Sequence, residues 1–107
     1  MEKIFNKLVR DNIPDIIHKN GEKAITRILS DEEYKLELER KLYEEYQEVL
    51  KTTNSKDRIE ELSDMLEIII SLANLENKTL DDVIEVAKDK RLKRGGFSKK
   101  IFLEKTY

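Results

Sequence analysis

The amino-acid sequence predicts an all-α fold: an antiparallel bundle of about four helices per chain, completed by homo-oligomerisation. Charged residues make up 41% and hydrophobic residues 38% of the 107 residues, with one proline and three glycines. That profile is typical of long amphipathic helices with charged outer faces. Capping and turn residues separate the helical stretches, and no internal linker or low-complexity tract interrupts them. A chain of this length suits one domain, residues 1–107.

The first element expected is a short helix over residues 12–18. Pro14 suits a helix start, and Gly21 follows the helix end. The next stretch, residues 24–29, favours β structure. It is therefore either a short strand or an extended link to the following helix.

Two long helices are expected in the middle of the chain. Ser30 and Glu33 form a capping box, which begins a helix that runs to about Lys51. Turn-forming residues come next. Ser55 is then expected to cap a third helix, which reaches about Glu76.

The last helix lies between two local signals. Thr79 with Asp82 caps its start, and Gly95-Gly96 follows its end. The tail, residues 100–104, is a second candidate for an extended segment. A pairing between this tail and the segment near Ile25 is one arrangement that the sequence allows.

The third helix is apolar around almost its whole circumference. A helix of that kind needs neighbours on several sides, and three companions of modest apolar width do not cover it within one chain. A homodimer or a dimer of dimers is therefore expected, with the third helix near the interface. Its apolar residues are Ile59, Leu62, Met65, Leu66, Ile68, Ile69, Ile70, Leu72, Ala73 and Leu75.

Composition argues against several classes of protein. The formal net charge of −2 gives no basic field for a nucleic-acid surface. Without cysteine the chain has no disulfide, no thiolate nucleophile and no cysteine-ligated zinc, which fits a reducing cytoplasm. The N-terminus lacks the apolar core of a signal peptide, and no apolar stretch approaches the roughly 20 residues that span a bilayer.

Two helical segments each carry a pair of acids three residues apart, on or beside the apolar face. The pairs are Glu45 with Glu48 and Glu61 with Asp64. Residues i and i+3 share one face of a helix, so the members of each pair project together. Because an unpaired buried carboxylate is costly, such groups are usually neutralised by a cation. Four converging carboxylates would suit divalent metal ions.

Four other residues each allow a structural and a ligand-binding interpretation. Lys41 lies one turn before Glu45, where it forms either an ordinary ion pair of about 0.2–0.5 kcal/mol or a contact to phosphate. Lys90 and Arg94 continue the apolar stripe of the fourth helix. They either complement the C-terminal dipole of that helix or bind an anionic ligand. Phe97 either packs over a ligand or anchors the tail.

The acidic residues resemble the metal-binding signature of the MazG-like, all-α nucleoside triphosphate pyrophosphohydrolases. Two flanking segments, residues 7–14 and 90–97, are similar to the ends of one branch of that family. Its members are labelled phosphoribosyl-ATP pyrophosphohydrolase-like or house-cleaning nucleotide pyrophosphatases. The resemblance covers nearly the whole chain in the expected order. Its acidic motifs are Glu44-Glu45-x-x-Glu48 and Glu61-x-x-Asp64.

The resemblance implies hydrolysis of a nucleoside triphosphate at the α-phosphorus, which yields a nucleoside monophosphate and pyrophosphate. The implied cofactor is Mg²⁺, with Mn²⁺ as the alternative. One of the acids, or Glu44, would act as general base, and sequence does not choose among them. The implied metal ligands are Glu45, Glu48, Glu61 and Asp64, and the substrate-binding residues are Lys41, Lys90, Arg94 and Phe97.

Rival functions come from other classes. Phosphoribosyl-ATP pyrophosphohydrolase of histidine biosynthesis would use a similar metal platform. A di-iron carboxylate bundle would want Glu-x-x-His pairs, and no histidine follows either acidic pair. The non-enzymatic rival is a helical nucleotide-binding or interaction module. Nothing in the sequence specifies the base or the sugar.

Overall fold

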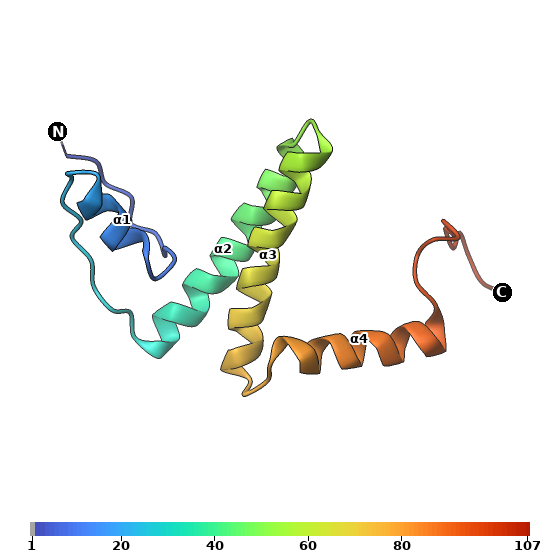
Figure 1. Ribbon diagram of the computed structural model, residues 1–107. Coiled ribbons are helices and arrows are strands. Elements are labelled where there is room, and N and C mark those ends of the chain that lie inside the picture. Colours follow the sequence, from blue (N-terminus) through green and yellow to red (C-terminus); the bar gives the residue numbers. More distant parts are fainter. Residues whose placement is uncertain (1) are drawn as a thin grey trace.

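The computed structural model describes residues 2–107 and is all-helical, which confirms the predicted all-α class (Figure 1). Four helices and no strand are present among these residues. No helix among them combines the length and the apolar character that a membrane crossing requires. The helices are α1 (Ile13–Lys19), α2 (Asp31–Lys51), α3 (Ser55–Leu75) and α4 (Leu80–Arg94).

The start of α2 confirms the predicted capping box. The Ser30 hydroxyl accepts a hydrogen bond from the Glu33 backbone N–H, and the Glu33 carboxylate accepts one from the Ser30 backbone N–H. Arg27 lies 3.0 Å from the same carboxylate. Hydrogen bonding to Arg27, followed by that to Ser30, lowers the pKa of Glu33. The cap therefore acts as a small network in which Arg27 also neutralises the capping acid.

The start of α3 corrects the prediction by one residue, because Asn54 and not Ser55 is the N-cap. The Asn54 backbone is extended, and its side-chain oxygen accepts the Asp57 backbone N–H at 2.9 Å. Ser55 is already the first helical residue. Both residue types cap helices well, but only one can stand at the boundary. The helix ends at Leu75, one residue before the expected end.

The bounds of α4 agree with the prediction. Thr79 and Asp82 form a complete capping box. At the other end, Gly95 has a φ of 82°, in the left-handed region that glycine adopts without steric cost. Local sequence signals are therefore sufficient to begin and end this helix.

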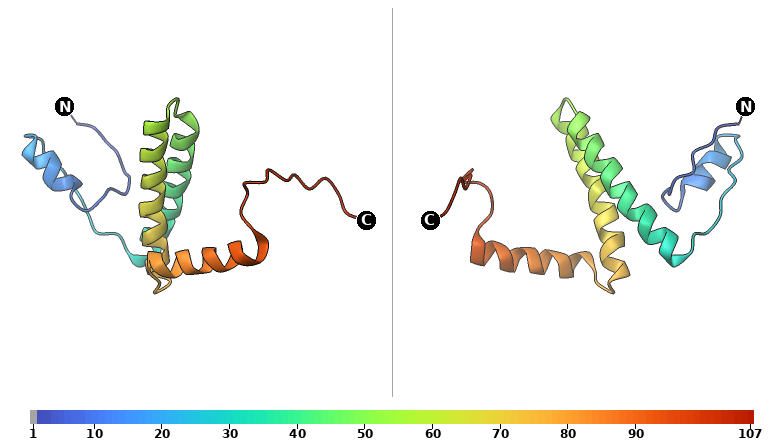
Figure 2. Two further views of the ribbon diagram at one scale, coloured as in Figure 1. Left: turned by 45° about the vertical axis from the view of Figure 1, so that its right-hand side comes forward. Right: turned by 180° about the vertical axis from the view of Figure 1, so that it is seen from behind.

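The long helices α2 and α3 form an antiparallel hairpin, and α1 and α4 extend from it in different directions (Figure 2). Among residues 2–107, only α2 and α3 pack along their length, while α4 meets α3 near the end of the hairpin. All the buried hydrophobic side chains among the described residues belong to this hairpin: Leu38, Val49, Ile68 and Ala73.

The two candidate extended segments do not pair. Residues 24–29 connect α1 to α2 without forming a strand, and residues 100–104 form none either. The predicted pairing is wrong within this chain, since the tail and the α1–α2 link lie on opposite sides of the hairpin (Figure 1). Both Ile25 and Phe102 are exposed.

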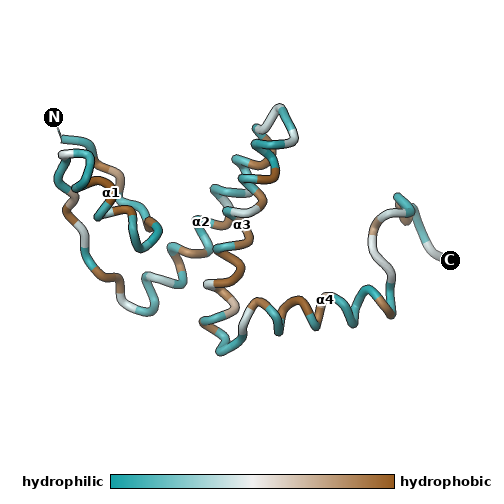
Figure 3. The backbone as a smooth tube through the Cα atoms, in the orientation of Figure 1, coloured by the Kyte–Doolittle hydropathy of each residue, from teal (hydrophilic) through white to brown (hydrophobic). Residues whose placement is uncertain are grey.

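The single chain is far from compact. Its accessible surface is 10303 Å², whereas a compact protein of this size exposes about 6,200 Å². Its radius of gyration is 18.3 Å, compared with about 13 Å for a compact domain of this length. Hydrophobic positions recur along α3 and along the protruding α4 (Figure 3). The chain therefore leaves much apolar surface without a partner of its own.

Candidate metal centre

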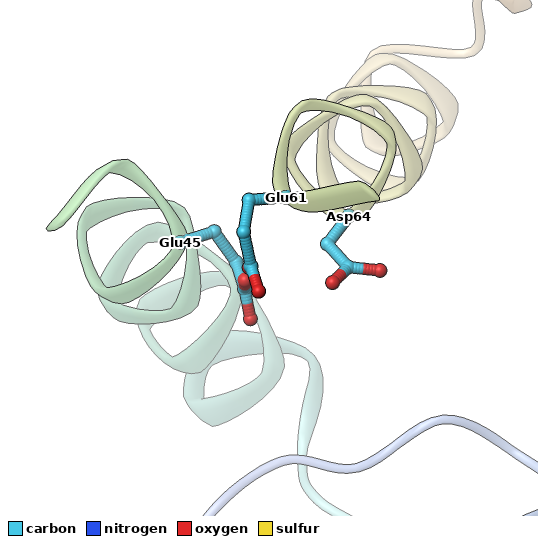
Figure 4. A group of neighbouring side chains, drawn as sticks. All are labelled: Glu45, Glu61 and Asp64. Carbon is cyan, nitrogen blue, oxygen red and sulfur yellow. The ribbon is translucent and has the colours of Figure 1, made fainter. Parts of the chain in front are cut away.

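Three acidic side chains from the hairpin point to one side and meet there (Figure 4). Glu45 comes from α2, and Glu61 and Asp64 come from α3. One carboxylate oxygen of each lies within 4.8 Å of the others. All three residues are half-buried. We refer to Glu45, Glu61 and Asp64 as the acidic cluster.

The register of the hairpin explains the meeting. Glu45 precedes Thr52, at the end of α2, by seven residues, and Glu61 follows the Asn54 cap of α3 by seven. Equal distances from a tight turn place two residues opposite each other in an antiparallel pair of helices. Asp64 follows Glu61 by three residues, so it shares that face of α3. The predicted convergence of acids therefore depends on the length of this turn.

The surroundings of Glu45 in the cluster disfavour its charged form. The pKa of Glu45 is raised, first by burial, then by hydrogen bonding with Glu61 and by the negative charges of Asp64 and Glu61. Lys41 acts in the opposite direction. Carboxylates that repel one another in a partly dry site gain the most from a shared cation. The donor set consists of oxygen alone, which suits hard ions such as Mg²⁺ or Mn²⁺.

Two of the predicted acids lie outside the cluster. Glu48 is exposed, and its Oε1 lies 3.6 Å from Lys51 Nζ. It nevertheless lines the same open groove as Glu61, near the turn end of the hairpin. Glu44 Oε2 lies 3.5 Å from Lys41 Nζ. Of the two interpretations of Lys41, the structure contains an ion pair, but its partner is Glu44, three residues away, and not Glu45.

The predicted substrate-binding residues of the C-terminal part are not brought to the cluster within one chain. Helix α4 begins beyond the end of the hairpin that is remote from the turn, and it runs outward from there (Figure 2). Glu61 precedes Leu75 by 14 residues, which is about 21 Å along the helix axis. Lys90 and Arg94 are exposed, and Phe97 is 99% exposed. Lys41 is the predicted substrate contact that lies near the acids.

The structure adds Arg10, to which the sequence assigned no role. Its Nη2 donates a hydrogen bond to Asp64 Oδ1 at 2.8 Å, across 54 residues of sequence. The N-terminal chain passes beside the open side of the cluster, as the pale segment below the acids shows (Figure 4). Residues 7–14 were distinctive in the sequence, but a contact over such a separation leaves no periodic or capping signal.

Comparisons with protein-family models, with curated proteins and with solved structures found no match for this chain. The likeness to the MazG-like enzymes therefore stays a prediction from the motifs. The geometry of the acidic cluster is a separate line of argument, because it follows from the fold of the hairpin alone.

Proposed function

We propose that this protein is a Mg²⁺-dependent nucleoside triphosphate pyrophosphohydrolase that cleaves at the α-phosphate. The observation that supports the proposal is the convergence of Glu45, Glu61 and Asp64 from two helices, at the spacing of the family motif. These three residues would hold the metal, and Glu48 could join them from the groove that it shares with Glu61. Non-standard nucleotides are the proposed class of substrate.

The reaction adds water to the α-phosphorus and breaks the bond to the bridging oxygen of the β-phosphate. The products are a nucleoside monophosphate and pyrophosphate. When bound, the metal would neutralise phosphate charge and acidify the attacking water. A carboxylate of the cluster, or Glu44, would take the proton of that water. Positioning and neutralisation would supply most of the rate, as is general for phosphoryl transfer.

We also propose that the active form is a homodimer or a dimer of dimers. The surface exceeds that of a compact protein of this size by about 4,000 Å². A standard interface covers only about 800 Å² per partner, whereas obligate interfaces are larger and more apolar. In such an assembly, Lys90 and Arg94 would reach the acidic cluster of another protomer, because α4 leads away from its own cluster. Each active site would then combine acids from one chain with cations from a second.

A nucleotide screen tests the proposed activity. Purified protein is incubated with Mg²⁺ and each of a set of standard, oxidised and deaminated nucleoside triphosphates, and also with phosphoribosyl-ATP. Pyrophosphate and orthophosphate are scored separately. We expect pyrophosphate with at least one substrate and no release without metal. Orthophosphate alone would contradict attack at the α-phosphorus, and binding without either product would favour the non-catalytic module.

A further inference from the structure

Arg10 forms one exposed ion pair, and its partner, Asp64, belongs to the acidic cluster. Among residues 2–107, the other side-chain hydrogen bonds join residues nine or fewer positions apart, so the Arg10–Asp64 bond is the long-range one. The side chains of Arg10 and Asp64 remain 59% and 41% exposed. Exposed ion pairs are weak and exchange readily. This contact is therefore suited to being made and broken during function.

The pair also involves a carboxylate of the proposed metal centre. Arg10 occupies Oδ1 of Asp64, a carboxylate that belongs to the acidic cluster. A guanidinium is permanently charged, and its planar donors match a carboxylate or a phosphate equally well. Arg10 thus supplies part of the positive charge that the three acids need. A metal ion bound by Asp64 would compete with it.

Once displaced from Asp64, Arg10 would stay beside the cluster, because the N-terminal segment that carries it passes along the open side of the cluster (Figure 4). The phosphates of a metal-bound nucleotide would approach from that side. Arg10 therefore offers positive charge to an incoming anion as soon as the acids are neutralised.

We propose that Arg10 is an exchangeable counter-cation of the metal centre, which leaves Asp64 for a phosphate oxygen when metal and nucleotide bind together. The proposal rests on the proposed function of the acidic cluster. It has a regulatory consequence, since Arg10 opposes metal binding in the free protein and favours it in the substrate complex. Metal and nucleotide then bind with positive coupling.

Two measurements with opposite expected signs test this role. Mn²⁺ binding without nucleotide is measured by electron paramagnetic resonance, and binding of a non-hydrolysable α,β-methylene triphosphate is measured by calorimetry with Mn²⁺ present. Arg10→Ala should bind Mn²⁺ alone about two- to fivefold more tightly, since an exposed competitor is removed. It should bind the analogue about tenfold or more weakly, since a charged hydrogen bond to phosphate is lost. Arg10→Lys should fall between the two proteins in both measurements.

Arg27→Ala is the matched control. Arg27 is also an exposed arginine in an ion pair, with Glu33 at 3.0 Å, but its partner lies outside the acidic cluster. This variant should match the wild type in both binding measurements. Weaker Mn²⁺ binding by Arg10→Ala without nucleotide would overturn the proposal, because Arg10 would then be a support that orients Asp64.

The outcomes separate this proposal from the proposed function. If the wild type binds Mn²⁺ and releases pyrophosphate while Arg10→Ala behaves as Arg27→Ala does, only the role of Arg10 is overturned. If the wild type neither binds Mn²⁺ nor releases pyrophosphate, the metal centre and the exchange at Asp64 are overturned together.

Discussion

The α2–α3 hairpin and the C-terminal region, residues 80–107, begin with equally good helix signals but differ in what they bury. The hairpin contains the buried hydrophobic residues and the acidic cluster. Helix α4 has a complete capping box and yet buries none of its residues. The difference shows that capping determines where a helix begins, whereas packing requires an apolar partner. In this protein the hairpin supplies its own partner, whereas α4 meets only α3 within the chain, and the proposed dimer would supply the partner that α4 lacks.

The largest expected effect on activity comes from a substitution in the hairpin, where the proposed metal site lies. Glu61→Gln removes the charge of a proposed metal ligand in the acidic cluster. Pyrophosphate release should fall about 100-fold or more, because even residues one layer outside a metal's ligands cost about 10–100-fold when removed. The exposed Glu67→Gln on the same helix is the control and should keep wild-type activity.

Glu48→Gln sharpens this test, because Glu48 lies outside the cluster and beside Lys51. We expect a clearly smaller loss than for Glu61→Gln. An equal loss would mean that Glu48 turns into the centre when the metal binds. Full activity in both variants would contradict the site.

The next effect concerns α4 as an interface. Ile84 lies on its apolar stripe and is 39% exposed. Burying a side chain of this size contributes about 1.5–3 kcal/mol, so Ile84→Glu should weaken dimerisation about tenfold or more. Light scattering over a concentration series measures the change.

Lys93→Glu is the control for the introduced charge. Lys93 is nine residues from Ile84, which places it about 180° around the helix. It should leave the assembly intact. A wild-type protein that is monomeric at micromolar concentration would contradict the interface itself.

A mixing experiment tests whether the two regions meet between chains. Glu61→Gln and Arg94→Ala are each expected to be impaired as pure dimers. In a random mixture, half of the dimers contain one chain of each kind, and one of their two sites carries both wild-type residues. Activity should therefore recover to about a quarter of the wild-type value, as the symmetry of a two-fold dimer requires. No recovery, with mixed dimers shown to form, would contradict a site shared between chains.

The same contrast explains which features the sequence could predict. The capping boxes at Ser30 and Thr79 depend on residues three positions apart, so local chemistry was sufficient. Asn54 was missed because a second good cap, Ser55, stands next to it. The convergence of Glu45 with Glu61 required only a helical hairpin with a short turn. These features share short sequence separations or a fixed register.

The features that could not be predicted from the sequence depend on contacts that are distant along the chain or that compete with one another. Arg10 reaches Asp64 across 54 residues, where no helical period applies. Glu48 was expected in the cluster by spacing, but a neighbouring lysine offers its carboxylate a local partner. The direction of α4 depends on which surface covers its apolar stripe. An amphipathic pattern indicates that the apolar stripe needs a packing partner, but it does not identify that partner.

The smallest expected effect concerns the charge of the acidic cluster. The folded protein raises the pKa of Glu45 above its ordinary value, so the folded state binds more protons than the unfolded state between the two values. The free energy of unfolding therefore falls as the pH rises through that interval. Glu45→Gln removes this titration. Without metal, the variant should melt a few degrees above the wild type at pH 7, and the two should converge at pH 4.

Mg²⁺ should reverse that order. A ligand that binds only the folded state stabilises it, so Mg²⁺ at pH 7 should raise the melting temperature of the wild type and have little effect on Glu45→Gln. Glu44→Gln is the neighbouring control, because Glu44 pairs with Lys41 outside the cluster. It should gain no stability without metal and should respond to Mg²⁺ as the wild type does. An identical response of all three proteins to pH and Mg²⁺ would mean that the cluster is an ordinary solvated surface, which the hairpin register brings together without a cation to hold.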